Sequence, residues 1–247
     1  MAEDLRALLP EPGATSVEDL LDSFRPWEHP HPDRPFLAVN FATTLDGRAA
    51  IEGRSGKIGS STDTEMLQRL RTRFDAVMVG AGTVRAERYG RIVSNPEWRE
   101  RRERIGLPHD PLAVIVSGRL DLPWDAPVFT DGGGRVLIFT ASDAEPPATA
   151  TPVRVVRHEG RVDIAAALSH LRGERGVRAL LCEGGPGLHG ELQGAGLVDE
   201  LFLTIAPKLA GGRGAHILEG ELSSTAELEP VWLLERSGEL FARYRRG

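Results

Sequence analysis

A glycine-rich segment behind a short apolar run combines the residue types that phosphate binding needs. Residues 179–182 have the composition of a buried strand, and Glu183 follows them directly. Three glycines and a proline then lead to a segment that we predict to be helical from about Leu188. Backbone with little side-chain bulk, ahead of a helix N-terminus with unpaired N–H groups, suits a phosphate. The sequence therefore predicts a nucleotide cofactor here, with the Glu183 carboxylate beside the reacting group.

The spacing of Gly185, Gly187 and Gly190 matches G-x-G-x-x-G, the turn that binds dinucleotides in Rossmann folds. Two features argue against a Rossmann fold. The motif comes late in the chain, and the acid expected about 20 residues later at the end of a strand is missing, because Asp199 and Glu200 begin that strand. We therefore interpret the segment as a phosphate-binding loop in another topology, and a tight turn without a ligand is the alternative.

A second glycine cluster, which includes Gly82 and Thr83, follows the apolar run 76–80. The Thr83 hydroxyl is suited to donate to a phosphate, and Glu87 lies about one helical turn beyond it. Because open parallel sheets bind ligands at the carboxyl ends of their strands, we expect a ligand to lie across both glycine turns. A simple turn is the alternative here.

A third apolar run, 112–116, ends beside Ser117 and Arg119. A guanidinium group matches phosphate oxygens bidentately, so these side chains at a strand end suit a ribose 2′-phosphate. A polar turn with a solvated arginine is the alternative interpretation.

Apolar runs typical of strands alternate with segments of helical spacing from residue 36 onward. This order predicts an α/β fold with a largely parallel sheet that helices cover on both sides. Strands are expected over 36–43, 76–80, 112–117, 136–140, 153–156 and 199–207, and helices over 62–73 and 164–171. Residues 231–234 and 240–244 are expected to form an antiparallel C-terminal hairpin.

The first 35 residues differ from this pattern, and we predict an arm over 1–35 and a single domain over 36–247. Leu5, Leu8 and Leu9 are expected to form a short amphipathic turn, and residues 17–24 have helical spacing. Prolines at positions 26, 30, 32 and 35 then keep the chain extended.

The overall charge argues against some partners. The formal net charge is −6, whereas a nucleic-acid binder usually shows a basic face, so we expect no nucleic-acid partner. The densest basic run, residues 99–104, alternates arginine with glutamate, which predicts a solvated helix face.

Cysteine content and hydropathy bear on location and on metal chemistry. Cys182 is the only cysteine, so it cannot form an intrachain disulfide, and it is expected to be a core residue in a reducing compartment. No run approaches the length of a membrane span and the N-terminus lacks the order of a signal peptide, so we expect a cytoplasmic protein without a membrane partner. A single cysteine cannot supply a zinc-deaminase motif, and no metal site is predicted.

Four blocks in order resemble the reductase domain of the bifunctional riboflavin-biosynthesis deaminase/reductase. They are residues 44–49, 80–84, 183–186, and 196–200 together with 205–208. The resemblance runs from residue 36 to the end. It implies a dihydrofolate-reductase-like fold, NADPH as cofactor and a homodimer. It also implies a reaction, the reduction of the ribosylamino side chain of a phosphorylated pyrimidine to a ribitylamino one.

Carried over by position, the resemblance assigns roles to individual residues. It implies that Ser55, Arg71 and Glu183 face the substrate, and that Asp46 lies with Thr43 where the first strand opens onto the nicotinamide. Arg71 is our first choice for the substrate's 5′-phosphate. The cofactor-binding set comprises Thr43, Lys57, Gly82, Thr83, Glu87, Ser117, Arg119, Gly184, Gly185, Pro186, Gly187 and Leu188.

The chemistry expected is a hydride transfer to C1′ of the opened ribose, with Glu183 orienting or protonating the pyrimidine. The chain departs from the family where Glu87-Arg88-Tyr89-Gly90 stands in place of Asp-Asp-Pro, and the resemblance covers no deaminase half. Whether the substrate is deaminated is left open. The alternatives are a reductase of a pteridine such as dihydrofolate, or a non-catalytic nucleotide-binding paralogue.

Overall fold

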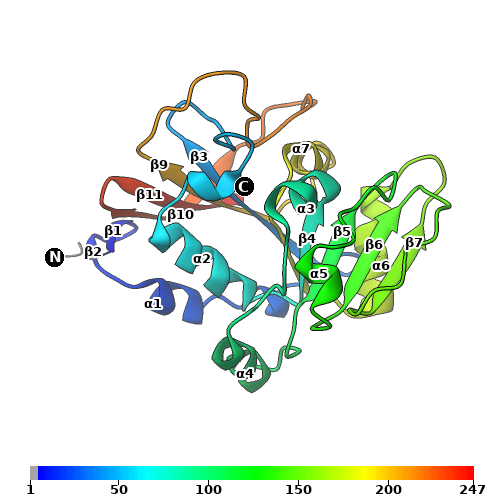
Figure 1. Cartoon of the computed structure of the whole chain (residues 1–247). Coiled ribbons are helices and arrows are strands. Elements are labelled where there is room, and N and C mark those ends of the chain that lie inside the picture. Colours follow the sequence, from blue (N-terminus) through cyan, green and yellow to red (C-terminus); the bar gives the residue numbers. More distant parts are fainter. Residues whose placement is uncertain (1–4) are drawn as a thin grey trace. The chain divides into compact units, whose positions relative to one another are not determined.

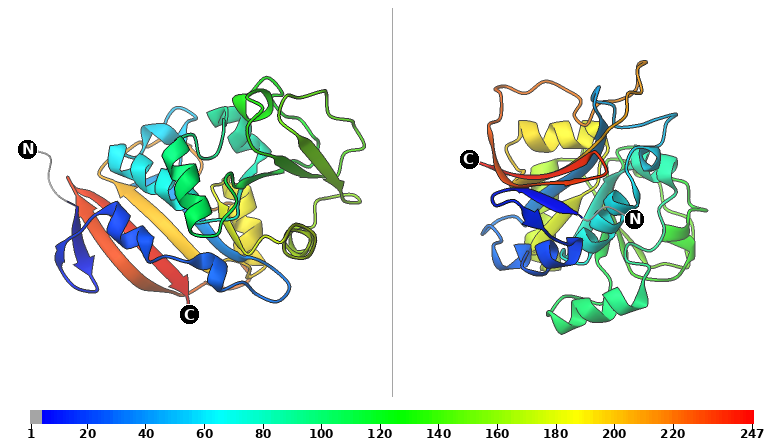
Figure 2. Two further views of the ribbon diagram at one scale, coloured as in Figure 1. Left: turned by 90° about the horizontal axis from the view of Figure 1, so that it is seen from below. Right: turned by 90° about the vertical axis from the view of Figure 1, so that its left-hand side faces the viewer.

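The computed structural model describes residues 5–247, and contacts group them into two compact units. The first unit comprises residues 5–25, 37–70 and 186–247, and the second comprises residues 26–36 and 71–185. Figure 1 colours the chain along its sequence, and Figure 2 adds two views. The sequence segments of the two units interleave, so neither unit is one continuous stretch of chain.

The first unit has a mixed sheet in the strand order β2-β1-β10-β11-β9-β3. β3 runs parallel to β9, from the pair Ala38–Glu200 to the pair Thr44–Ala206, and the other neighbours are antiparallel. The strands are β1 (Arg6–Leu9), β2 (Gly13–Ala14), β3 (Phe36–Thr44), β9 (Glu200–Ala206), β10 (Leu228–Arg236) and β11 (Glu239–Arg246).

The helices of this unit include α1 (Val17–Asp22), α2 (Ser61–Arg71, whose last residue belongs to the second unit) and α7 (Pro186–Gly194). A short 3-10 helix covers Ser55–Lys57. The core of the unit includes an aromatic cluster, in which the Phe202 ring lies 5.5 Å from Phe24 and 5.9 Å from Trp232 between centroids. The α1 segment is thereby tied to the sheet through residues near its end.

The second unit has parallel strands in the order β8-β4-β5-β6-β7. Most of their residues are buried on both faces, as expected of apolar runs in a sheet that helices cover. The elements are β4 (Ala76–Gly80), α3 (Ala81–Glu87), α4 (Pro96–Arg104), β5 (Leu112–Val116), α5 (Pro127–Thr130), β6 (Val136–Thr140), β7 (Val153–Arg157), α6 (Ile164–Arg175) and β8 (Ala179–Cys182), with a 3-10 turn over Pro26–Glu28.

These observations confirm the predicted α/β class, the parallel strands and the antiparallel C-terminal hairpin. The prediction for Leu5, Leu8 and Leu9 was wrong, because β1 is an extended strand paired with β10. A strand of four mostly exposed residues has too short a pattern to separate from a helical turn. Leu5 is buried, whereas Leu8 and Leu9 are exposed.

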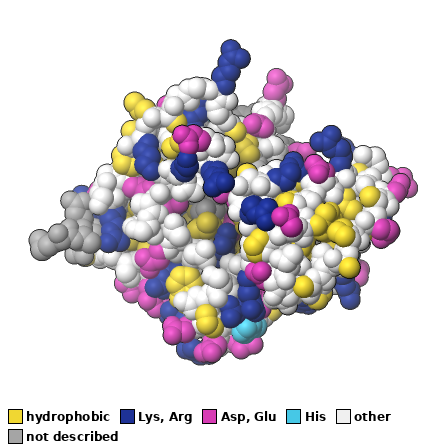
Figure 3. Space-filling model, viewed as in Figure 1, with side chains coloured by type: hydrophobic (Ala, Val, Ile, Leu, Met, Phe, Trp, Pro, Cys, Tyr) yellow, Lys and Arg dark blue, Asp and Glu magenta, His cyan; other side chains and the backbone are white. Residues whose placement is uncertain are grey.

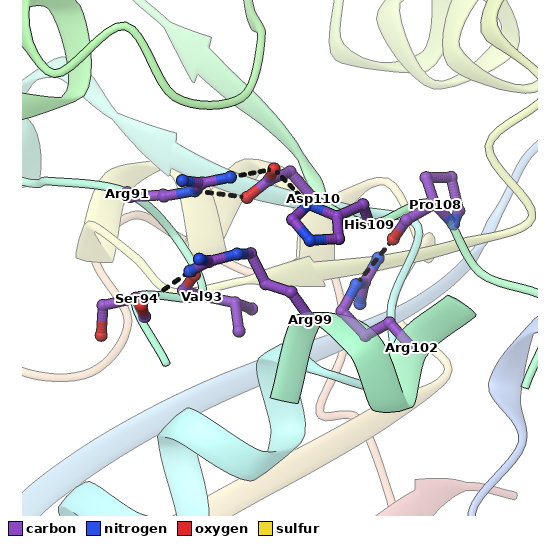
Figure 4. A network of polar contacts seen from close by, with 8 residues as sticks. All are labelled: Arg91, Val93, Ser94, Arg99, Arg102, Pro108, His109 and Asp110. Carbon is purple, nitrogen blue, oxygen red and sulfur yellow. Dashed lines mark hydrogen bonds and ion pairs between the residues drawn. The ribbon is translucent and has the colours of Figure 1, made fainter. Parts of the chain in front are cut away.

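The prediction of a solvated helix over 99–104 was correct for the helix α4 and wrong for one side chain. Arg102 is fully buried. Its guanidinium donates to the carbonyl oxygens of Pro108 (2.9 Å), Arg71 (3.0 Å) and Phe74 (2.9 Å), and Figure 4 shows the first of these contacts. Neutral carbonyl partners leave no charge pattern in the sequence, so alternation of charges cannot reveal this burial.

Charged side chains of both signs lie interspersed on the face drawn in Figure 3. Within residues 5–247, no helix has both the length and the apolar composition that crossing a bilayer demands. In the same range, His, Cys, Asp and Glu side chains form no group suited to hold a metal ion.

Candidate active site

Three adjacent strands of the second unit end at one edge of its sheet. β8, β4 and β5 are neighbours and run parallel, so the segments that follow Cys182, Gly80 and Val116 lie along the same edge. The chain continues the ladder beyond β8, since the Glu183 N–H donates to the Met78 carbonyl at 2.9 Å and the Gly80 N–H donates to the Gly184 carbonyl at 2.8 Å. This pairing holds the two predicted glycine turns against one another.

The contact between the two turns depends on the absence of side chains. A Cβ atom on Gly80 would lie 3.3 Å from the Gly185 nitrogen, and one on Gly185 would lie 3.2 Å from the Thr83 hydroxyl. Gly184 has a φ of +110°, which L side chains rarely adopt, and the Gly184–Gly185 peptide is cis. Around Gly82 a Cβ would meet nothing within 4 Å, so the backbone there faces open space.

Glu183 lies at the centre of a buried polar cluster. Arg71 donates to it bidentately, with Nε to Oε1 at 2.7 Å and Nη2 to Oε2 at 2.6 Å. The Tyr89 hydroxyl donates to Oε2 at 2.7 Å, and the Arg71 guanidinium lies 5.5 Å from the Tyr89 ring centroid. The Glu183 side chain is 3% exposed and that of Arg71 is 12% exposed. Arg71 also donates to the Ile92 carbonyl at 3.3 Å.

The electrostatics of this cluster keep both donors protonated. Burial lowers the pKa of Arg71, but the charge and hydrogen bonds of Glu183 outweigh this and raise it above its ordinary value. Burial, followed by the charge of Glu183, raises the pKa of Tyr89 well above its ordinary value. With three donors on its two oxygens, Glu183 is arranged as a hydrogen-bond acceptor. Of its two predicted roles, orientation fits this arrangement better than proton donation.

The sequence pattern did not predict these partners. Arg71 was expected at the substrate phosphate, whereas the structure shows its guanidinium bound to Glu183. Tyr89 was expected only as part of a departure from the family pattern, and no spacing rule links positions 89 and 183. The available signal was that a residue with a hydroxyl group, Tyr89, stands in the segment where the chain departs from the family pattern.

The remaining predicted residues of this unit lie at the same strand ends or on α3. Ser117 is buried, and its N–H donates to the Phe139 carbonyl at 2.9 Å, whereas Arg119 is exposed. Thr83 and Glu87 are half-buried on α3, whose N-cap, Gly80, offers no side-chain hydrogen bond. The N-cap residue therefore supplies no side-chain acceptor for the first N–H groups of α3.

In the first unit, Asp46 fixes the turn that follows β3. Its carboxylate accepts from the Thr44 hydroxyl at 2.6 Å and from the N–H groups of Ala210 at 3.0 Å and Gly211 at 2.7 Å. These bonds lower the pKa of Asp46 well below its usual range, that of Thr44 contributing most. Thr43 is buried at the end of β3, and its hydroxyl donates to the Thr44 carbonyl at 3.1 Å.

Ser55 and Lys57 lie on the exposed 3-10 helix of the same unit. Lys57 forms an ion pair with Glu52. The ammonium group of Lys208 donates to the carbonyls of Lys57 at 3.0 Å and Ile58 at 2.7 Å. The loop that carries both predicted residues is thereby bound to the segment that follows strand β9.

Helix α7 begins at Pro186, where Gly187 is exposed and Leu188 is buried. The third glycine of the motif, Gly190, faces other backbone, because a Cβ there would lie 1.8 Å from the Glu219 carbonyl oxygen. The Glu219 N–H in turn donates to the Pro186 carbonyl at 3.1 Å. Gly190 therefore serves close packing, whereas a Cβ on Gly187 would meet nothing within 4 Å.

Comparison with known proteins identifies relatives over most of the chain. The RibD C-terminal domain model matches residues 35–239. The 2,5-diamino-6-ribosylamino-4(3H)-pyrimidinone 5′-phosphate reductase of Archaeoglobus fulgidus is 35% identical over 216 residues, which are 85% of this chain and 96% of that protein. The protein of the same name from Methanothermobacter thermautotrophicus is 33% identical, over 76% of this chain and 85% of its own.

A solved structure agrees with these matches. The pyrimidine reductase-like protein of Corynebacterium diphtheriae has a TM-score of 0.78 and 25% identity, over 94% of this chain and 99% of that one. The fold and the relatives thus define the class as an α/β oxidoreductase of the pyrimidine reductase type. The chain belongs to the RibD C-terminal domain family, and the resemblance found in its sequence blocks is confirmed.

Proposed function

We propose that this chain reduces the ribosylamino side chain of a phosphorylated pyrimidine to a ribitylamino one, with NADPH as the reductant. The observation that carries the proposal is the buried Glu183 at the end of β8, beside a glycine corner without side-chain bulk. Family membership and the names of the relatives support the reaction class. They do not favour a pteridine substrate or a non-catalytic role.

The second unit offers a fit for part of a nicotinamide cofactor. A Cβ on Gly80 or Gly185 would crowd the opposite turn, so the corner carries no side chains there, and the backbone at Gly82 faces open space. We assign the phosphates to the glycine turns and Thr83, and the 2′-phosphate to Ser117 and Arg119. Thr43, Lys57, Glu87, Gly184 and residues 186–188 remain in the proposed cofactor-binding set, as predicted from the sequence. When bound, NADPH supplies the hydride.

The chain's own residues supply position and charge. Glu183 presents a carboxylate held rigidly by Arg71 and Tyr89, which suits an acceptor for N–H groups on a pyrimidine ring. Arg71 acts through Glu183 in this proposal and not directly on the substrate phosphate. Asp46 and Ser55 remain proposed substrate contacts, and Asp46 also fixes the turn after β3.

Among possible substrates we favour the diamino form, which has not been deaminated. Two relatives are named as reductases of the 2,5-diamino compound, and this chain covers 96% and 85% of their length. By contrast, the chain spans only 50% of the RibD protein of Bacillus amyloliquefaciens. The deaminated uracil compound is the second candidate.

The test is NADPH oxidation by the purified chain with each candidate: the diaminopyrimidinone ribosyl phosphate, its uracil counterpart and dihydrofolate. We expect the highest kcat/KM with the diamino compound. Product analysis must show a ribitylamino side chain. Turnover of dihydrofolate alone, or of none of the three despite NADPH binding, would refute the proposal.

Two further parts of the proposal concern the state of the protein. We infer a homodimer from the family resemblance, and sedimentation velocity tests it. We also infer a cytoplasmic location, supported by the buried Cys182, whose pKa is raised to about 12 chiefly by burial, so its thiol is suited to packing. Localisation of a tagged chain in its own cells tests that inference.

A further inference from the structure

A cavity of about 220 Å³ lies in the second unit at the amino ends of its parallel strands. Its lining includes Leu112 and Val136, the first residues of β5 and β6, and Val177, which precedes β8. Glu183 and the glycine turns follow the carboxyl ends of the same strands. A five-residue strand such as β4 spans about 16 Å, so this cavity is separate from the candidate active site.

Three arginines from different segments line the cavity; Arg135 and Arg154 are exposed, and Arg175 is half-buried. Arg135 precedes β6, Arg154 is the second residue of β7, and Arg175 is the last residue of α6. Within the part of the chain that the structure describes, none of the three forms an ion pair with an acidic side chain. The Nε atom of Arg175 is buried and has no hydrogen-bond partner there. A buried donor without an acceptor is costly, so a ligand that accepts from it gains affinity.

The acidic residue in the lining, Asp75, does not balance these charges. One carboxylate oxygen accepts from the Arg178 guanidinium at 2.9 Å, and the other accepts from the N–H groups of Arg178 at 2.9 Å and Ala179 at 3.0 Å. Asp75 is thereby neutralised by a residue outside the lining. The cavity keeps an excess of positive charge in a chain whose net charge is −6.

The rest of the lining is largely apolar. Leu112, Val136, Leu137 and Val177 contribute aliphatic surface, and prolines extend it. At roughly 30 Å³ for each water, the volume equals about seven water molecules, which is room for one ring with a phosphate group. A lining that combines apolar surface with several cations matches an anion with an organic portion better than it matches an inorganic ion.

We propose that this cavity binds an organic phosphate monoester whose organic part is a single ring or a similar apolar group. Guanidinium groups pair bidentately with phosphate oxygens, and three of them approaching from different elements match a dianion with three terminal oxygens. The ring contacts Leu112, Val136 and Val177. This site is independent of the proposed reductase function.

The test is calorimetric titration of the full chain with phenyl phosphate, in saturating NADPH so that the proposed cofactor site is filled. The test variant is Arg135→Gln/Arg154→Gln. The control is Arg104→Gln/Arg161→Gln, which removes the same charge from two exposed arginines of the second unit. We expect the test variant to bind at least about tenfold more weakly and the control to bind as the wild type does. Phenol and inorganic phosphate should each bind more weakly than phenyl phosphate.

Several outcomes would overturn the proposal: no binding at millimolar phenyl phosphate, equal weakening by both variants, or loss of binding when the reductase substrate is added. Circular dichroism and NADPH affinity check that each variant is folded. If the double variant does not fold, Arg175→Lys keeps the charge and removes the planar fork. A several-fold weaker affinity in that variant supports the site, and an unchanged affinity contradicts it.

Discussion

At the scale of single residues, the Arg71–Glu183 pair determines how the candidate site responds to substitution. Both side chains are nearly buried, so removal of one leaves the other charge without its partner. We predict that Arg71→Met and Glu183→Met each lower the free energy of unfolding by about 3–5 kcal/mol. The double variant should be more stable than either single variant, because two apolar side chains leave no buried charge. Urea denaturation of the four proteins measures this coupling.

An exposed pair provides the control for that cycle. Arg88 and Asp125 form an ion pair at 2.9 Å, with side chains 53% and 74% exposed. Their methionine cycle should show no measurable coupling. Additive losses in the Arg71–Glu183 cycle would contradict the structure of the cluster. All Glu183 variants should also lose turnover, whatever their stability.

Tyr89 provides a second prediction at this scale. Tyr89→Phe removes one hydrogen bond to a carboxylate and should lower the free energy of unfolding near neutral pH by about 1–2 kcal/mol. Because the folded state raises the pKa of Tyr89, this contribution is fully present below about pH 10 and declines as pH rises toward the higher folded value. Urea denaturation of wild type and variant, at about pH 8 and about pH 10.5, measures both effects.

The stability difference between the two proteins should therefore narrow at the alkaline pH. A difference that widens there would mean that the phenol is not the protonated donor to Glu183. Since Tyr89 positions Glu183 in our proposal, Tyr89→Phe should lower kcat more than it changes KM for the pyrimidine.

At the scale of elements, the packing of α7 makes two glycines of one motif respond differently. A Cβ at Gly190 would lie 1.8 Å from the Glu219 carbonyl oxygen, which is backbone, whereas a Cβ at Gly187 would meet nothing within 4 Å. We predict that Gly190→Ala lowers the free energy of unfolding by about 1–3 kcal/mol through overpacking. Gly187→Ala is the matched control and should be neutral or slightly stabilising, since alanine favours helices.

NADPH affinity gives these two variants a second measurement. If Gly187 lies against a cofactor phosphate as proposed, Gly187→Ala weakens NADPH binding although the fold is unharmed. Unchanged affinity would remove Gly187 from the cofactor-binding set and leave the rest of the proposal intact.

The sequence predicted the continuous apolar strands well and the short helices poorly. The strands β4 and β6 have the predicted limits, and β5 ends one residue early, because continuous apolar runs between turns have few alternative structures. Helices α3 and α5 were not predicted, because seven and four residues make about two turns or fewer and show too little helical periodicity. The arm predicted over 1–35 and the single domain predicted over 36–247 stay predictions, because the interleaved segments of the two compact units set no boundary along the chain that tests them.

The candidate site, like the fold, was predicted from the sequence only in part. The position of Glu183 at a strand end followed from the residues that precede it. Its pairing with Arg71 joins residues 112 positions apart, and only tertiary structure brings such residues together. The burial of Arg102 against carbonyl oxygens is a further contact of this kind.

At the scale of the whole molecule, cofactor binding should appear as a change in global stability. A ligand that binds only the folded chain adds about 2.7 kcal/mol at a concentration 100 times its Kd. For a chain of 247 residues, this corresponds to a rise in Tm of roughly 5–10 °C. We predict such a rise with NADPH and a smaller one with NADH at equal concentration, because Ser117 and Arg119 are assigned to the 2′-phosphate.

Arg119→Gln tests this assignment, because Arg119 is exposed after β5 and its loss should leave the fold unchanged. The variant should show a smaller Tm rise with NADPH and the same response to NADH, so that the two nucleotides become more alike. Arg104→Gln, which removes another exposed arginine, at the end of α4, should respond to both as the wild type does. Equal responses to NADPH in the two variants would move the 2′-phosphate away from Arg119. If NADPH and NADH stabilise the wild type equally, the chain does not bind the 2′-phosphate. Ser117 and Arg119 would then belong to a polar turn.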